Sequence, residues 1–84
     1  MIVYILATCV PGNEKDVISR IKALPNVVEV NGVMGRYDVF IKVSAETPVV
    51  VDSAISKVRG IPHITSTFTM SAIYGQGGTI DDEK

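Results

Sequence analysis

Hydrophobic residues form two different patterns in the first part of the chain, a continuous run and then a helical repeat. Residues 1–10 form a continuous apolar run rich in β-branched and aromatic side chains, and Pro11-Gly12 ends it, which predicts a buried strand followed by a turn. Residues 14–24 carry apolar side chains at helical spacing, with Asn13 as the expected N-cap and Pro25 as the stop. The chain is therefore expected to open with a strand and a helix.

The next stretch predicts a β-hairpin. Residues 27–34 and 37–44 are strand-like, and Gly35-Arg36 between them suits a two-residue type II′ turn, whose first position needs a positive φ. This register sets Glu29 opposite Lys42, an opposite-charge pair that supports the alignment. Alternation sends to the core face Val28, Val30, Met34, Tyr37, Val39, Ile41 and Val43. It sends to the other face Glu29, Asn31, Val33, Asp38, Phe40 and Lys42.

A second helix and a last strand are predicted in the C-terminal half. Thr47-Pro48 combines a capping hydroxyl with a proline at the first helical position, and Gly60 ends the apolar stripe that follows. Residues 63–74 form the last predicted strand. Alternation places on one side Ile64, Ser66, Phe68, Met70 and Ala72, and on the other Thr65, Thr67, Thr69 and Ser71. Residues 75–84 have no periodicity and are expected to be a flexible acidic tail after a domain of residues 1–74.

The order β-α-β-β-α-β predicts a ferredoxin-like α+β fold, an antiparallel four-stranded sheet with two helices on one face. A faint internal repeat supports it, because the cap Asn13 matches Thr47 and Val17 matches Val51 at the same offset. The helices need only one face of the sheet. The other face still carries Val33 and Phe40, so a monomer would expose an apolar patch. We expect this face to pack against a second copy across a two-fold axis, as in a dimeric α+β barrel.

Charge and cysteine content narrow the classes of function. Lysine and arginine total 8 against 9 acidic residues, a net charge of −1 that offers no footprint for nucleic acid or anionic lipid. The single Cys9 cannot form an internal disulfide, and no second cysteine or histidine lies at metal-ligand spacing. The first ten residues lack a basic leader and fall short of the ~20 residues of a membrane span. We expect a cytoplasmic protein without cofactor, membrane contact or direct nucleic-acid contact.

Few side chains are candidates for chemistry. His63 and Cys9 have no partner at relay spacing, so a structural role is favoured for both, and no catalytic residue is assigned. The threonines of the last strand are good strand formers and also a possible polar wall. Asp38 is harder to explain, because a carboxylate at the end of an apolar strand needs hydrogen bonds, solvent or a counter-charge. Together with the N–H groups of the Gly35-Arg36 turn, it could bind a small zwitterion, meeting its ammonium group.

The segments "PNVVEVNGVMGRYDVFIKV" and "GIPHITSTFTM", with the apolar first strand and the "PG" turn, resemble the effector-binding (RAM) domain of the Lrp/AsnC transcription regulators. The likeness covers residues 1–74, and Gly-x-Tyr-Asp is its most specific element. The resemblance implies that Gly35, Tyr37 and Asp38 match the family motif, with Arg36 at the variable position and Met34 before it. It also implies, more loosely, that Thr67 and Thr69 lie near the effector. These residues make up the predicted ligand-binding set.

The same resemblance implies a function. Members of the family dimerise through their sheets, assemble further into tetramers or octamers, and bind amino acids between dimers near the hairpin. Full-length members carry a helix-turn-helix domain first, whereas Met1 here opens directly into the first strand, so we expect a stand-alone domain that tunes a helix-turn-helix relative. Two alternatives remain open: an enzyme of the dimeric α+β barrel type, such as a cofactor-free monooxygenase or isomerase, and a ligand-free oligomerisation module.

Overall fold

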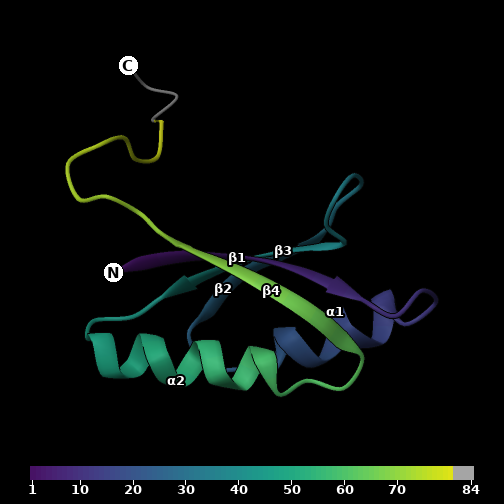
Figure 1. The fold of residues 1–84 in the computed structure, drawn as a ribbon. Helices are drawn as coiled ribbons and strands as arrows, with labels where there is room; N and C mark the ends of the chain where they lie inside the picture. The colour runs from purple at the N-terminus through teal and green to yellow at the C-terminus, as the bar shows by residue number, and fades with distance from the viewer. Residues whose placement is uncertain (81–84) are drawn as a thin grey trace.

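The computed structural model describes residues 1–80 and has the predicted order of elements. Its strands and helices are β1 (Ile2–Cys9), α1 (Glu14–Lys22), β2 (Val27–Gly32), β3 (Val39–Ser44), α2 (Pro48–Arg59) and β4 (Ile64–Ser71), as Figure 1 shows. The strands form one antiparallel sheet in the order β2-β3-β1-β4. This confirms the ferredoxin-like α+β fold. The expected tail, residues 75–84, has no helix or strand up to residue 80, and residues 81–84 lie outside the described residues.

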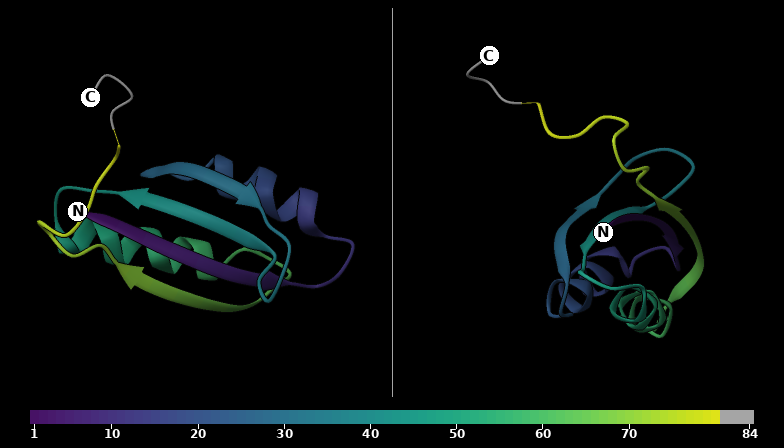
Figure 2. Two further views of the ribbon diagram at one scale, coloured as in Figure 1. Left: turned by 90° about the horizontal axis from the view of Figure 1, so that it is seen from above. Right: turned by 90° about the vertical axis from the view of Figure 1, so that its left-hand side faces the viewer.

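Both helices cover the same face of the sheet, and the core lies between them and the strands (Figure 2). Alternation in the two central strands is strict, because every second residue of β1 and of β3 is buried and the residues between are half-buried. The core consists of Val3, Ile5, Ala7, Cys9, Val17, Ile21, Val39, Ile41, Val43, Ala45, Val51, Ala54, Val58 and Ile61. Burying one such aliphatic side chain stabilises the fold by about 1.5–3 kcal/mol relative to leaving it in water. Among residues 1–80, no helix is long and apolar enough to cross a membrane.

The hairpin has the predicted register but a longer connection. Glu29 pairs with Lys42 as expected, whereas the strands end at Gly32 and Val39. The two-residue turn was therefore wrong, and residues 33–38 form a loop, which we call the β2–β3 loop. At Asp38 the carbonyl still accepts the Val33 N–H in the predicted register, but the Asp38 N–H donates to the Ala7 carbonyl of β1, 2.9 Å away, and the regular ladder ends there.

Three residues predicted for the core face therefore lie elsewhere. Met34 and Tyr37 fall in the β2–β3 loop, where Met34 is fully exposed and Tyr37 half-buried. Val28 sits at a bulge between Val27 and Glu29, which turns its side chain to solvent so that 58% of it is exposed. A second bulge, opposite Cys9 on β4, turns Ile64 onto the core, away from the face that it was expected to share with Phe68.

The two βαβ halves repeat each other more closely than the sequence indicated. The two halves correspond at their helix starts, Asn13 and Thr47. The second helix then continues for longer, because α2 has 12 residues and α1 has 9. After this insertion Pro25-Asn26 corresponds to Pro62-His63, and Asn26 and His63 both adopt positive φ, 69° and 76°. Asparagine and histidine are among the non-glycine residues that tolerate this left-handed conformation. The position of His63 thus has a structural explanation.

Candidate functional site

The predicted site residues around Gly35 lie in the β2–β3 loop, which rises on the side of the sheet without helices (Figure 1). Gly35 has a φ of +133°, so the positive φ predicted for it is present although the turn is longer. A Cβ atom added at this glycine would meet nothing within 4 Å beyond its chain neighbours, and Met34 and Arg36 are exposed. The tip of the loop is therefore open, whereas its two ends, Val33 and Asp38, are joined by a hydrogen bond.

Asp38 is fixed by three contacts at the end of the sheet. Its main chain accepts a hydrogen bond from Val33 N–H and donates one to the Ala7 carbonyl, each 2.9 Å long. Its carboxylate oxygen Oδ2 accepts the Cys9 N–H at 2.9 Å, beyond Ala7, the last β1 residue in the ladder with β3. The side chain thus replaces a missing main-chain acceptor. The second oxygen, Oδ1, makes no hydrogen bond within residues 1–80 and remains available to a ligand.

A hydroxyl cluster lies on the same helix-free face. Thr8 Oγ1 is 2.7 Å from Thr65 Oγ1 and also hydrogen-bonds Ser66 Oγ. Thr8 follows Ala7 on β1, the residue whose carbonyl accepts the Asp38 N–H. Thr8 is not among the residues predicted for the site from the sequence. The alternation of β1 carries the signal, because its even-numbered residues point away from the core.

The predicted threonines of β4 lie on the other side of the sheet. Thr67 pairs with Ala7 and Thr69 with Ile5, two fully buried core residues, and side chains of directly paired residues share a face. The prediction that Thr67 and Thr69 share a face is confirmed. Asp38 lies beside Ala7 on the β3 edge of β1, and among residues 1–80 no hydrogen bond joins it to these threonines. Thr67 instead lines a pocket with Arg59, Ile64, Thr65 and Ser66.

The helix-free face is rich in half-exposed apolar side chains. Tyr4 and Phe40 stack with ring centroids 5.8 Å apart, as two cross-strand neighbours can. On β4, Phe68 is 52% exposed and Met70 40%. Val33, at the foot of the β2–β3 loop, adds a further exposed apolar side chain. We call Tyr4, Val33, Phe40, Phe68 and Met70 the apolar face.

Cys9 is buried in the core, and its environment disfavours the thiolate. Burial, followed by the negative charges of Asp38 and Glu14, raises the pKa of the thiol above its ordinary value. A nucleophilic cysteine needs the opposite shift. His63 is exposed, and its carbonyl accepts a hydrogen bond from the Val10 N–H. No group of metal-ligating side chains is present among residues 1–80.

Comparison with known proteins identifies the family. The Lrp/AsnC ligand-binding domain model matches residues 2–76. The chain belongs to this family. No curated protein matches the sequence. Membership makes the chain a regulatory domain of a family of transcription regulators, in agreement with the resemblance carried by the Gly-x-Tyr-Asp segment.

Solved structures support the assignment of the chain as an Lrp/AsnC domain. The hypothetical protein PHS023 from Pyrococcus horikoshii is 37% identical with a TM-score of 0.80, covering 87% of this chain and 90% of that one. FFRP-DM1 is also 37% identical, with a TM-score of 0.81 and coverage of 86% and 97%. AsnC of E. coli shares the fold at 23% identity and a TM-score of 0.79, and the match covers 94% of this chain and 55% of AsnC.

Proposed function

We propose that this Lrp/AsnC domain binds an amino acid or a closely related metabolite at a site that it completes by self-association. The observation that carries the proposal is the half-used carboxylate of Asp38, whose Oδ2 holds the Cys9 N–H while Oδ1 stays available. An ammonium group beside such a carboxylate forms a charge-assisted hydrogen bond, which is about twice as strong as a neutral one. The open β2–β3 loop next to it leaves room for the ligand.

The arrangement of the polar residues favours a site shared between copies. Asp38 lies at the end of the β2–β3 loop beside β1, and Thr67 and Thr69 lie on the helix side of β4, on the other edge of β1. Because β1 lies between the two sets, they are two strand spacings, roughly 10 Å, apart, which is farther than the distance between the two charged groups of one α-amino acid. If both sets contact the ligand, they come from different copies of the chain.

Self-association through the apolar face provides those copies. Its aromatic and aliphatic side chains are half-exposed in the single chain, and contiguous apolar patches of this kind mark interaction surfaces. A two-fold axis through this face gives a dimer, and contacts around the β2–β3 loops join dimers into a tetramer or an octamer. Mixed assembly with a helix-turn-helix relative then passes ligand binding on to transcription. The net charge of −1 agrees with an indirect effect on DNA.

Thermal unfolding with each of the twenty amino acids tests the ligand. We expect at least one of them to raise the melting temperature, because a ligand that binds only the folded state stabilises it. Asp38→Asn keeps an oxygen for the Cys9 N–H and removes the charge, so it should abolish the shift without unfolding the protein. Silence of the panel for the wild type would leave the ligand-free oligomerisation module, which depends on the apolar face alone.

A further inference from the structure

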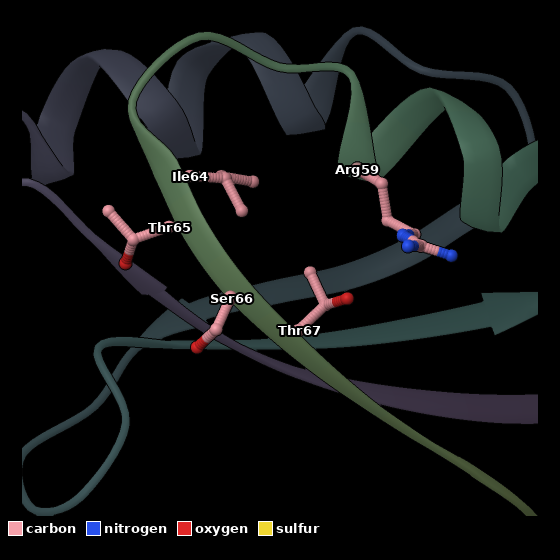
Figure 3. A pocket seen from close by; sticks show the side chains of 5 residues that line it. All are labelled: Arg59, Ile64, Thr65, Ser66 and Thr67. Carbon is pink, nitrogen blue, oxygen red and sulfur yellow. The ribbon is translucent and has the colours of Figure 1, made fainter.

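A shallow pocket of about 270 Å³ lies where the last turn of α2 meets the first half of β4, and we call it the Arg59 pocket. In Figure 3 the side chain of Arg59 extends beside β4, and the Thr67 hydroxyl points to the same side as the guanidinium. Thr65 and Ser66 also line the pocket, but their hydroxyls point the other way, toward their bonds with Thr8. The polar groups directed to the pocket are therefore those of Arg59 and Thr67.

The donors of Arg59 are free to meet a ligand. The one ion pair among residues 1–80 joins Arg20 to Asp16, an i,i+4 pair on α1. Arg59 makes no salt bridge and no side-chain hydrogen bond in this part of the chain. A guanidinium carries five N–H donors in a planar fork that matches a carboxylate with two parallel hydrogen bonds. The pocket thus has an unused carboxylate receptor at its rim.

The outer edge of β4 adds a second type of donor. The Ala72 N–H points to β1, where it donates to the Ile2 carbonyl at 2.9 Å. Backbone N–H groups of an antiparallel strand alternate in direction, so those of Met70 and Phe68 also point to β1. The N–H of Thr67 then points outward, because β4 is an edge strand. Thr67 offers both its hydroxyl and its backbone N–H on the outer side of the sheet.

We propose that the Arg59 pocket binds the carboxylate group of the metabolite, an inference that rests on the proposed function and names the ligand class. Arg59 grips the carboxylate with its fork, and Thr67 supplies the additional donors. The nearby C-terminal end of α2 carries partial negative charge, which opposes any anion, and it opposes a doubly charged phosphate more than a singly charged carboxylate. With Asp38 of another copy on the ammonium group, the ligand must keep both charged groups, as a free α-amino acid does.

Calorimetry on the full chain tests this assignment, with the amino acid that stabilises it most and the amine left by removing its carboxylate. The wild type should bind the amine about ten- to a hundredfold more weakly, the range for one charged hydrogen-bonded contact. Arg59→Gln should weaken the amino acid by a similar factor and leave the amine unchanged. Arg59→Lys, which keeps the charge without the fork, should fall between. Lys57→Gln, in the same turn but outside the pocket, should bind like the wild type.

The outcomes separate this inference from the proposed function. Loss of binding in Asp38→Asn with wild-type binding in Arg59→Gln overturns the Arg59 pocket and leaves the proposed function standing. If no amino acid binds, the NMR signal of the Arg59 Nε–H is followed with sodium acetate and with inorganic phosphate. A saturable response to acetate supports the pocket without the amino-acid site. No response to acetate overturns the pocket, and a stronger response to phosphate overturns the choice of a carboxylate.

Discussion

On the side of the sheet that carries the helices, Ile5, Ile41 and their neighbours are completely buried, whereas Phe68 on the opposite side is half-exposed. The same strands supply both faces, and both are rich in apolar residues, so amino-acid type does not distinguish them. What distinguishes them is cover: the chain's own helices close one face, and the apolar face and the hydroxyl cluster lie on the other. This difference indicates that the residues on the helix side stabilise the fold and that the residues on the helix-free side, which we call the open side, mediate assembly.

The largest expected effect is on stability and comes from the helix side. Ile41→Ala removes buried methyl groups from a side chain with no exposed surface and should lower the free energy of unfolding by about 2–5 kcal/mol. Phe68→Ala, on the open side of the same sheet, should cost less than half as much in the dissociated protein. Chemical denaturation at a protein concentration low enough to prevent association compares them. Equal losses would contradict the separation of the two faces.

The open side should control assembly instead. Phe68→Ser removes a half-exposed aromatic ring from the apolar face and should shift the mass in light scattering from an oligomer toward the single chain. Val49→Ser is the matched control, because Val49 is an exposed apolar residue on α2, away from that face. Its mass should remain that of the wild type. A wild-type protein that is monomeric at micromolar concentration would contradict the role given to the apolar face.

The fold could be predicted from the sequence because period, caps and charge pairing are local signals. Glu29 opposite Lys42 fixed the hairpin register, and Thr47 caps α2 through its hydroxyl as the sequence indicated. The failures have long-range causes. A bulge in β2 exposes Val28. The backbone N–H of Asp38 bonds to β1, a strand that lies far away in the sequence, and the predicted turn becomes a longer loop. Neither event leaves a pattern within the hairpin itself.

The candidate site was predicted only in part for the same reason. Alternation correctly put Phe40 on the helix-free face and gave Thr67 and Thr69 a common side. It could not relate β4 to β3, because the strand order and pairing decide which side of β4 faces the helices. Arg59 escaped notice since a basic residue in the last turn of a helix already has an ordinary role beside the helix dipole.

Asp38 has one role in the fold, through its bond to the Cys9 N–H, and a proposed role in ligand binding, and a pair of substitutions separates the two. Asp38→Ala leaves the Cys9 N–H without its acceptor and should lower the free energy of unfolding by about 1–3 kcal/mol. Asp38→Asn keeps a side-chain oxygen and should lose much less stability, while it loses the ammonium-binding charge. Denaturation and calorimetry of both variants measure the difference. If Asp38→Asn were as unstable as Asp38→Ala, the carboxylate charge itself would be part of the fold.

The smallest expected effect is a dependence of stability on pH that comes from Cys9. Burial, then Asp38 and Glu14, raise the pKa of this thiol above the ordinary 9.0, so the folded protein keeps the proton at a pH where the unfolded chain loses it. This contribution to stability is complete below about pH 9 and is lost as the pH rises through the raised pKa. The free energy of unfolding should therefore fall more steeply above pH 9 in the wild type than in Cys9→Ala. Asp38→Asn removes one of the charges that raise the pKa, so its Cys9 should react with iodoacetamide at a lower pH than the wild-type thiol. Identical reaction profiles would show that the charge of Asp38 does not affect the thiol, which leaves burial and Glu14 as the causes of the raised pKa.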